Sequence, residues 1–547
     1  MAGPSRTLSG VEPTSDSNLQ RGRACVYCRR RKMKCDGRKP ICGPCERANR
    51  AHECEYADSQ GRSTADYLEE DISRIESRIY ELEHPREAAV SAVFLYHPYK
   101  QPQRRTQMSS IMQVLDSSRP PFPGSVSNAD AWWNSPEPPM NMVENLVDTF
   151  IPYASDCGFF LDIERFRRDV LLPHPIGHHS RPSPALLATV YLFGITLNDS
   201  AAVKAHEKTF LSRALSSLPA SLSGIHPRKA IHALQAEILL SNYFYVSGRF
   251  LEGRYHTAAS VSLAVGTVML NPSATTLRSP DADAVEEVER MDGCWTTITL
   301  DKAWAVAMAT YPNLPDSSEM LNMLWPGENT PGTSPSTVSQ FLDGTEHQTA
   351  LMSPKTLVAK AVILWERANS LVVSWKPDTG LSQSADFSSA FALLDARIAE
   401  LRHKMAFVEQ PHSPGMRRTV VVGRGLVHAA MLQLHGAFAQ TSLESKEKCL
   451  ISAKTILELA ADPDLLGEST YICPIFATIW AAACEVAFDE IGSLRATRLA
   501  WAHDVATATE SELVGLLDGA LDVMRRFRTW PLLNSYILKI EQAYAAV

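Results

Sequence analysis

The stretch from Cys25 to Cys54, CVYCRRRKMKCDGRKPICGPCERANRAHEC, decides how the first part of this 547-residue chain folds. Six of the chain's 11 cysteines fall within it. Their spacing is C-x2-C-x6-C and then, after six further residues, C-x2-C-x8-C, so one arrangement occurs twice. Between the second and third cysteines, the run RRRKMK (29–34) holds five basic residues. The repeat predicts one small module built from two similar halves.

Clustered thiols indicate metal rather than disulfides here, because the N-terminus lacks an apolar export signal and intracellular thiols stay reduced. A structural zinc ion takes four thiolate or imidazole ligands in a tetrahedron. Two ions need eight ligand positions, which six cysteines supply only when two of them bridge. The repeat indicates that the bridges are the first cysteines of the two halves, Cys25 and Cys42. The predicted ligands of two zinc ions per chain are Cys25, Cys28, Cys35, Cys42, Cys45 and Cys54.

Other interpretations of this segment stay open. One zinc could use only the two C-x2-C pairs, which would leave Cys35 and Cys54 without a role. His52 could replace a cysteine, or the thiolates could hold an iron–sulfur cluster, which gives no reason for the basic run. The run itself is also typical of a nuclear localisation signal or of a solvated face.

From its first cysteine to the aromatic residue after the last, the segment resembles the fungal zinc binuclear cluster (Zn2Cys6) transcription factors. The resemblance implies two zinc ions per chain bridged by Cys25 and Cys42, a nuclear protein, and double-stranded DNA as partner. It also implies that the third and fourth residues after the second cysteine contact the base edges of CGG-like triplets. The DNA base contacts are then Arg31 and Lys32, and the phosphate contacts are Arg29 and Lys34.

A short helix between Cys28 and Cys35 would explain why basic residues lie between metal ligands. Some 30 residues cannot bury enough apolar area to fold alone, so the metal supplies the folding energy. Such a helix fits the major groove, where guanine presents the N7 and O6 acceptors that Arg and Lys recognise. The metal would thus hold the DNA-recognising helix rigid.

A short coiled coil is predicted over residues 66–84, within ADYLEEDISRIESRIYELEH, after a linker over 57–65. Its apolar residues are spaced 4, 3, 4 and 3 apart, which is typical of a parallel dimer and predicts a homodimer. The alternative is an amphipathic helix lying on the main body. The seam residues are Leu68, Ile72, Ile75, Ile79 and Leu82.

The charge distribution separates this N-terminal module from the rest of the chain. Residues 21–56, the predicted DNA-binding domain, hold 11 Lys and Arg against 4 Asp and Glu, a net +7, whereas the whole chain carries −8. We expect a disordered tail over 1–20 and a Pro- and Ser-rich flexible linker over 85–140. The chain therefore combines a basic N-terminal module with an acidic body.

Residues 141–547 predict one large all-α domain, because apolar residues recur with a helical period and strand alternation is almost absent. Gly248 indicates a helical hairpin with Ala258 and Ala259 at its close contact. Residues 230–325 resemble the fungal-specific transcription factor (middle homology) domain, although 309–312 depart from its pattern. The expected helices are 143–151, 185–197, 229–246, 254–269, 286–309, 355–375, 386–407, 422–438, 446–461, 474–489 and 511–527, with a further packed helix at the C-terminus.

No catalytic motif is found in this body, neither a Gly-rich phosphate loop nor H-E-x-x-H nor G-x-S-x-G, so an enzyme is not expected. The longest apolar stretch, Pro474–Cys484, is too short to span a bilayer, so no membrane partner is expected. His174, His178 and His179 predict a solvated loop. Trp295, Trp304 and Trp325 predict core positions rather than an effector pocket. The expected function is a sequence-specific RNA polymerase II transcription factor, with transcription co-regulators as further partners.

Overall fold

The computed structural model describes the following residues: 24–54, 56, 132–223, 225–267, 284–327, 336–346, 352–375, 381–408, 413–462, 466, 469–500 and 504–546. The chain divides into two units, Met1–Pro123 and Gly124–Val547. The predicted coiled coil over 66–84, with its seam Leu68, Ile72, Ile75, Ile79 and Leu82, lies outside the described residues.

The first unit is small and centred on cysteines. It contains helix α1 (Val26–Arg30), helix α2 (Gly43–Arg47) and the 3₁₀ turn η1 (Ala51–Glu53). Its buried hydrophobic cluster consists of five cysteine side chains, with Tyr27, Ile41 and Tyr56 among the half-buried neighbours. A core made of thiols rather than of aliphatic side chains cannot hold the unit together by the hydrophobic effect alone.

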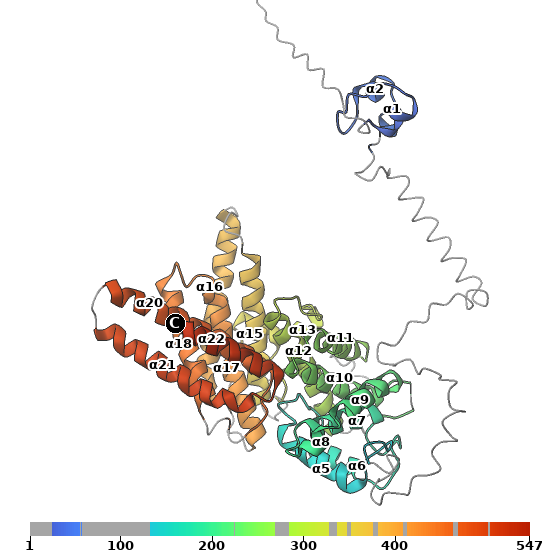
Figure 1. Ribbon diagram of the computed structural model, residues 1–547, viewed down its shortest axis with the longest axis vertical. Helices are drawn as coiled ribbons and strands as arrows, with labels where there is room; N and C mark the ends of the chain where they lie inside the picture. Colours follow the sequence, from blue (N-terminus) through green and yellow to red (C-terminus); the bar gives the residue numbers. More distant parts are fainter. Residues whose placement is uncertain are drawn as a thin grey trace, which may run out of the picture. The chain divides into compact units, whose positions relative to one another are not determined.

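The second unit is helical throughout its described part, where β-type pairing is limited to the isolated bridges Leu324–Thr337 and Met352–Val408. The predicted all-α class of the body is therefore confirmed. Its first half contains α5 (Met140–Phe150), α6 (Ile163–Val170), α7 (Pro184–Thr196), α8 (Ala201–Lys204), α9 (Glu207–Ser217), α10 (Lys229–Val246), α11 (Phe250–Gly266) and α12 (Ala284–Ala307). These are the cyan and green helices of Figure 1.

The second half of this body contains the helices drawn from yellow-green to red in Figure 1. They are α13 (Ser318–Leu321), α14 (Val338–Asp343), α15 (Pro354–Ser374), α16 (Leu381–Lys404), α17 (Pro414–Gly436), α18 (Leu443–Ala461), α20 (Ile475–Ala500), α21 (Asp504–Met524) and α22 (Pro531–Ala546). Helix α17 packs against α15 on one side and α18 on the other, and α18 packs against α20 and α21. The predicted packed helix at the C-terminus is α22.

The two halves of the body share one hydrophobic core that runs from Val143 to Ile540. Helix α12 joins them, since it packs against α10 and α11 in the first half and against α15 in the second. A buried ion pair also crosses between them, because the Arg418 guanidinium on α17 donates to Asp156 at 2.7 and 2.8 Å. The body is thus one cooperative packing unit rather than two.

The helical hairpin predicted around Gly248 is formed by α10 and α11, and Gly248 takes the left-handed conformation with φ +71°. The close contact, however, is made one turn earlier than Ala258 and Ala259, which are only half-buried. It lies at Gly253, where a Cβ would come 2.6 Å from the Tyr245 ring. The Ser241 hydroxyl donates to the Gly253 carbonyl at 2.9 Å, so the contact is polar as well as tight.

The body begins before the predicted boundary at residue 141. The Glu137 carboxylate accepts two hydrogen bonds, at 2.5 and 2.9 Å, from the buried Arg181 guanidinium, and a third from the Tyr191 hydroxyl at 3.0 Å. Trp133 stacks on His206 with ring centroids 4.0 Å apart. Residues 132–139, which composition placed in the linker, therefore belong to the packed body.

Candidate metal centre and nucleic-acid interface

The first half of the cysteine-rich unit is a short capped helix. Cys25 is the N-cap of α1, and its sulfur accepts a hydrogen bond from the Cys28 N–H at 3.4 Å. The helix ends in a Schellman motif, in which Met33 N–H donates to the Cys28 carbonyl at 2.9 Å and Lys32 N–H to the Arg29 carbonyl at 3.2 Å. Lys32 holds the left-handed position of this motif, with φ +55°.

The second half repeats this local structure. Cys42 is the N-cap of α2, and Asn49 holds the left-handed position with φ +54°. The Arg50 N–H donates to the Cys45 carbonyl at 2.9 Å, as Met33 does to Cys28 in the first half. The sequence repeat is therefore a structural repeat, in which Lys32 and Asn49 occupy equivalent positions.

The six sulfur atoms form two overlapping groups of four. One group is Cys25, Cys28, Cys35 and Cys42, and the other is Cys25, Cys42, Cys45 and Cys54. Within each group the sulfurs lie within 4.8 Å of one another, and the two groups share Cys25 and Cys42. These are the two thiols for which the repeat predicts a bridging position. Cys35 and Cys54, which a single zinc would leave out, each belong to one group.

The spacing of the sulfurs fits zinc. A tetrahedral zinc with bonds of about 2.3 Å places neighbouring sulfurs about 3.8 Å apart. The Cys25 sulfur lies 3.7 Å from that of Cys42 and 3.7 Å from that of Cys45, and Cys28 lies 3.6 Å from Cys42. The donor set is soft thiolate throughout, which zinc accepts.

Burial opposes ionisation of three of the thiols. Burial raises the pKa of the Cys25, Cys28 and Cys45 thiols. Burial also acts to raise the pKa of Cys54, but the Cys42 N–H that donates to its sulfur at 3.2 Å, together with hydrogen bonds from the neighbouring thiols, lowers the pKa overall. Thiols packed together in this way become thiolates when a divalent cation takes the place of their protons.

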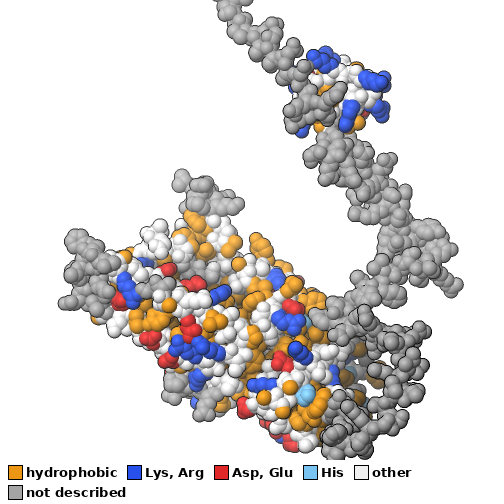
Figure 2. Space-filling model, in the orientation of Figure 1, with side chains coloured by type: hydrophobic (Ala, Val, Ile, Leu, Met, Phe, Trp, Pro, Cys, Tyr) orange, Lys and Arg blue, Asp and Glu red, His pale blue; other side chains and the backbone are white. Residues whose placement is uncertain are grey.

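The basic residues are arranged differently from the predicted helix between Cys28 and Cys35. Helix α1 begins before Cys28 and ends at Arg30, because the Schellman motif closes it. Arg31 and Lys32 lie in the turn that follows, and all residues from Arg29 to Lys34 are exposed. Figure 2 shows Lys and Arg side chains gathered on the surface of this unit. The cysteines therefore face inward while the basic side chains face solvent.

Two residues that the sequence did not single out fix the loop between the halves. The Asp36 carboxylate accepts from the Gly43 N–H at 3.0 Å, which caps α2, and a Cβ at Gly43 would come 2.6 Å from this carboxylate. The Tyr56 hydroxyl donates to the Arg38 carbonyl at 2.8 Å. In the sequence, the one feature that marked Tyr56 was its position as an aromatic residue two places after the last ligand, Cys54.

The other candidates in the body are not brought together into a metal site. His174 and His178 stack at 4.1 Å in an exposed segment, and within the described residues no metal-binding group includes them. Trp295, Trp304 and Trp325 are buried as predicted, with 3%, 3% and 1% exposed. No helix in the described ranges combines the length and apolar character that crossing a bilayer requires.

Comparison with known proteins identifies the cysteine-rich unit. Residues 23–63 match the family model of the fungal Zn(2)-Cys(6) binuclear cluster domain. The chain is 24% identical over 336 residues to the Notoamide biosynthesis cluster transcriptional coactivator notQ' of Aspergillus versicolor, which covers 58% of each chain. It is 39% identical over 64 residues to the C6 finger domain transcription factor hasF of Aspergillus fumigatus, covering 11% of this chain and 8% of that protein.

The chain thus aligns with less than two thirds of the length of either relative. No solved structure matches it.

Proposed function

Since residues 23–63 form a fungal Zn(2)-Cys(6) binuclear cluster domain, which binds two zinc ions, we propose that this chain is a nuclear, sequence-specific DNA-binding transcription regulator of RNA polymerase II genes. The observation that carries the proposal is the pair of overlapping cysteine groups with an exposed basic turn directly attached to them. Cys25 and Cys42 bridge the two ions, and Cys28, Cys35, Cys45 and Cys54 complete the two tetrahedra.

DNA recognition in this proposal depends on the turn that ends α1. Arg31 and Lys32 contact the base edges of a CGG-like triplet, because their donors match the guanine N7 and O6 acceptors. Arg29 and Lys34 contact phosphates on either side and fix the register without distinguishing bases. Bound zinc ties both ends of the basic stretch, Cys28 and Cys35, so the recognising side chains approach the groove on a rigid support.

A homodimer would bind two triplets. The seam Leu68, Ile72, Ile75, Ile79 and Leu82 supports this part of the proposal through its spacing. Native mass spectrometry of the full chain is expected to give two chains per particle, with two zinc ions per chain. Replacing a seam residue, Ile75→Asp, should give monomers, whereas Ser77→Asp, off the seam, should leave dimers; dimeric Ile75→Asp protein would contradict the seam.

The DNA-binding proposal is tested with full-length protein and duplexes that carry paired CGG triplets or the same bases scrambled. The Arg31→Ala/Lys32→Ala protein should lose roughly 30- to 10,000-fold in affinity for the CGG duplex, because two base contacts are removed and each is worth about 1–3 kcal/mol. Its zinc content should not change. Arg47→Ala, which removes an exposed charge from the second half, serves as the control and should keep the preference for CGG. If the double variant still preferred the CGG duplex over the scrambled duplex as strongly as the wild type, the assignment of Arg31 and Lys32 as base contacts would be refuted.

A second candidate is that the chain acts as a coactivator whose helical body docks other regulators while the zinc domain only localises it. The observation that favours it is that a relative similar over 336 residues is named a transcriptional coactivator. Under this alternative, the Arg31→Ala/Lys32→Ala protein would still reach target promoters in chromatin immunoprecipitation, although it no longer bound CGG duplexes alone. The resemblance of residues 230–325 to the middle homology domain supports a regulatory body under either candidate.

A further inference from the structure

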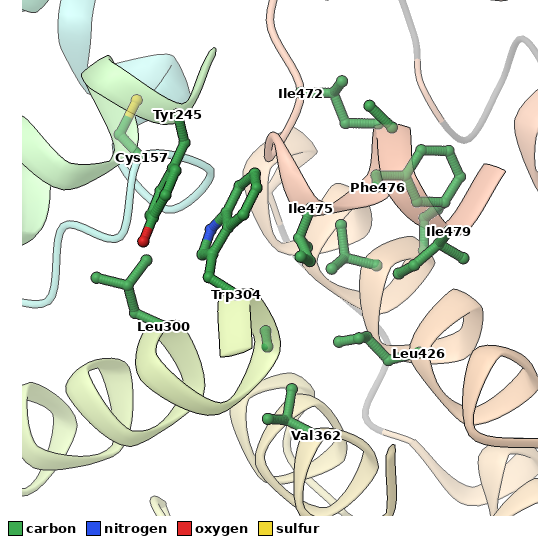
Figure 3. Packing of buried hydrophobic residues seen from close by; sticks show 14 of the residues in the cluster. Cys157, Tyr245, Leu300, Trp304, Val362, Leu426, Ile472, Ile475, Phe476 and Ile479 are labelled. Atoms are coloured by element: carbon green, nitrogen blue, oxygen red, sulfur yellow. The ribbon is translucent and has the colours of Figure 1, made fainter. Parts of the chain in front are cut away.

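The helical body contains a pocket of about 160 Å³ at the junction of its two halves. Residues of α10 and α12 line one side, residues of α15, α17 and α20 line the other, and the segment 155–160 completes the wall. Figure 3 shows three of the lining residues, Leu300, Trp304 and Ile475, converging from α12 and α20. The pocket lies within the unit Gly124–Val547 and contains none of the residues assigned to zinc or DNA.

Four aromatic side chains line the pocket, and the two indoles among them are held by stacking. Trp304 stacks on Tyr245 with ring centroids 3.8 Å apart and planes at 12°, an arrangement visible in Figure 3. Trp295 stacks on Trp325 at 4.9 Å. Because each lining indole is fixed by a partner behind it, the pocket is built into the core and does not depend on a mobile side chain. Phe159 and Phe160 add further aromatic surface.

One hydrogen-bond acceptor in this wall, the side-chain oxygen of Asn242, has no donor among the described residues. Asn242, which is 4% exposed, donates through Nδ2 to the Cys157 carbonyl at 3.0 Å and to the Ile238 carbonyl at 3.2 Å. These two bonds orient the amide, and its Oδ1 accepts no hydrogen bond from any described residue. The Thr299 hydroxyl, also in the wall, makes no hydrogen bond among the described residues either.

The backbone accommodates this arrangement at Gly158. This residue has φ +76°, and a Cβ there would come 3.0 Å from both Asn242 Nδ2 and Ile238. A side chain at position 158 would therefore displace the amide that presents the acceptor. A ligand that covers this oxygen without donating a hydrogen bond to it would pay about 1–3 kcal/mol for the unpaired acceptor.

The mouth of the pocket is polar. Lys355, whose side chain is 53% exposed, pairs with the buried Asp292 carboxylate, and exposed Ser155 lies in the same rim. Most of the remaining lining is apolar, and the buried Asp156 carboxylate in the wall is already paired with Arg418, so a ligand would place its ring against the apolar surface and its donor toward Asn242. An apolar cavity of about 150 Å³ holds benzene, so the volume suits one substituted ring.

We propose that this pocket binds a small aromatic molecule that carries a hydrogen-bond donor, such as a phenol or an aryl amine, with the donor bonded to Asn242 Oδ1. The aromatic walls provide the binding surface, and the unpaired acceptor selects for the donor. This inference goes beyond the DNA-binding role and does not depend on it, since the two sites share no residue.

The test uses the zinc-loaded full-length chain with phenol and toluene, which have nearly the same shape and differ in the O–H donor. Isothermal titration calorimetry should show saturable binding of one phenol per chain. Toluene should bind at least about tenfold more weakly, because it leaves the buried acceptor unpaired, a difference of about 1.4 kcal/mol. Equal affinities would refute the role of Asn242, and no saturable phenol binding would refute the site.

Two substitutions on α12 separate the pocket from non-specific binding. Thr299→Phe fills the pocket from a half-buried position and should abolish phenol binding, whereas Val288→Phe, at a position 54% exposed on the same helix, should leave it unchanged. Retained binding in Thr299→Phe would refute the location. If the Thr299→Phe protein does not fold, saturation-transfer NMR of the wild-type chain tests the site instead. Magnetisation transfer from the protein to phenol must then exceed the transfer to toluene. Binding to CGG duplexes is measured in parallel, so that failure of the pocket proposal can be distinguished from failure of the DNA-binding proposal.

Discussion

Lys32 shows at the scale of one residue how the cysteine-rich unit combines folding with recognition. It holds a left-handed position that most side chains avoid, and its equivalent in the second half is Asn49, a residue type that tolerates this conformation. Lys32→Asn should therefore keep the fold and the zinc content but weaken binding to CGG duplexes about 5- to 100-fold. Lys32→Val should lower the zinc-loaded unit's stability as well, since a β-branched residue is strained there. Circular dichroism, zinc content and DNA titration distinguish the two; equal loss of fold in both variants would contradict this account.

His428 makes the stability of the body depend on pH. Burial, with a smaller contribution from the nearby Arg402 charge, lowers the pKa of His428 to about 4. The unfolded chain, with a His pKa near 6.5, then binds more protons than the folded chain, so stability is lost as pH falls from about 6.5 to 4.

The expected loss from His428 approaches about 1.4 kcal/mol per pH unit within that window. Urea unfolding followed by tryptophan fluorescence measures it, because all ten tryptophans lie at or after Trp132 and report on the body. The His428→Gln protein should show a shallower pH dependence than the wild type between pH 6 and 4.5. If the free energy of unfolding fell equally with pH in the two proteins, protonation of His428 would not be the cause of the loss.

At the scale of elements, the crossing of α5 and α7 depends on Gly194. A Cβ at this position would overlap the backbone of Leu146 on α5, so the helices can approach this closely only with glycine. Gly194→Ala should destabilise the body by about 1–3 kcal/mol despite the better helix propensity of alanine.

Gly515 provides the matched control for this crossing. It lies in α21 at an exposed position, and a Cβ there would meet nothing within 4 Å. Gly515→Ala should stabilise the body by about 0.5–1 kcal/mol, through propensity alone. Urea titrations of both variants measure the two effects, and a stabilised Gly194→Ala protein would contradict the close crossing.

The helices of the body were predictable where one face is apolar and both ends are signalled. Helix α10 has the predicted bounds, Lys229–Val246, and Gly248 follows it as the expected break. Helices α6 and α9 were not predicted, because they are short and mostly polar, with only Phe166 and Val170, or Phe210 and Ala214, buried. Periodicity is a weak signal over so few turns.

On the scale of the whole molecule, the two units should respond differently to zinc removal. The cysteine-rich unit has a thiol core and depends on metal, whereas the body has a continuous hydrophobic core of its own. A strong zinc chelator should abolish binding to CGG duplexes while the thermal unfolding of the body, followed by tryptophan fluorescence, stays unchanged. Restoring zinc should restore DNA binding. A chelator-induced shift of the body's transition would show that the units are coupled.

The sequence by itself determined the zinc module, because ligand type and spacing are local properties that survive without knowledge of the fold. Helical periodicity likewise determined that the body is all-α. Only the tertiary structure decided that α1 ends at Arg30 and presents Lys32 in a left-handed turn, and that Asp36 and Tyr56 fix the loop between the halves. It also decided the pocket, which Asn242 lines together with side chains from four other helices. Such sites join segments far apart in the chain, and packing alone brings them together.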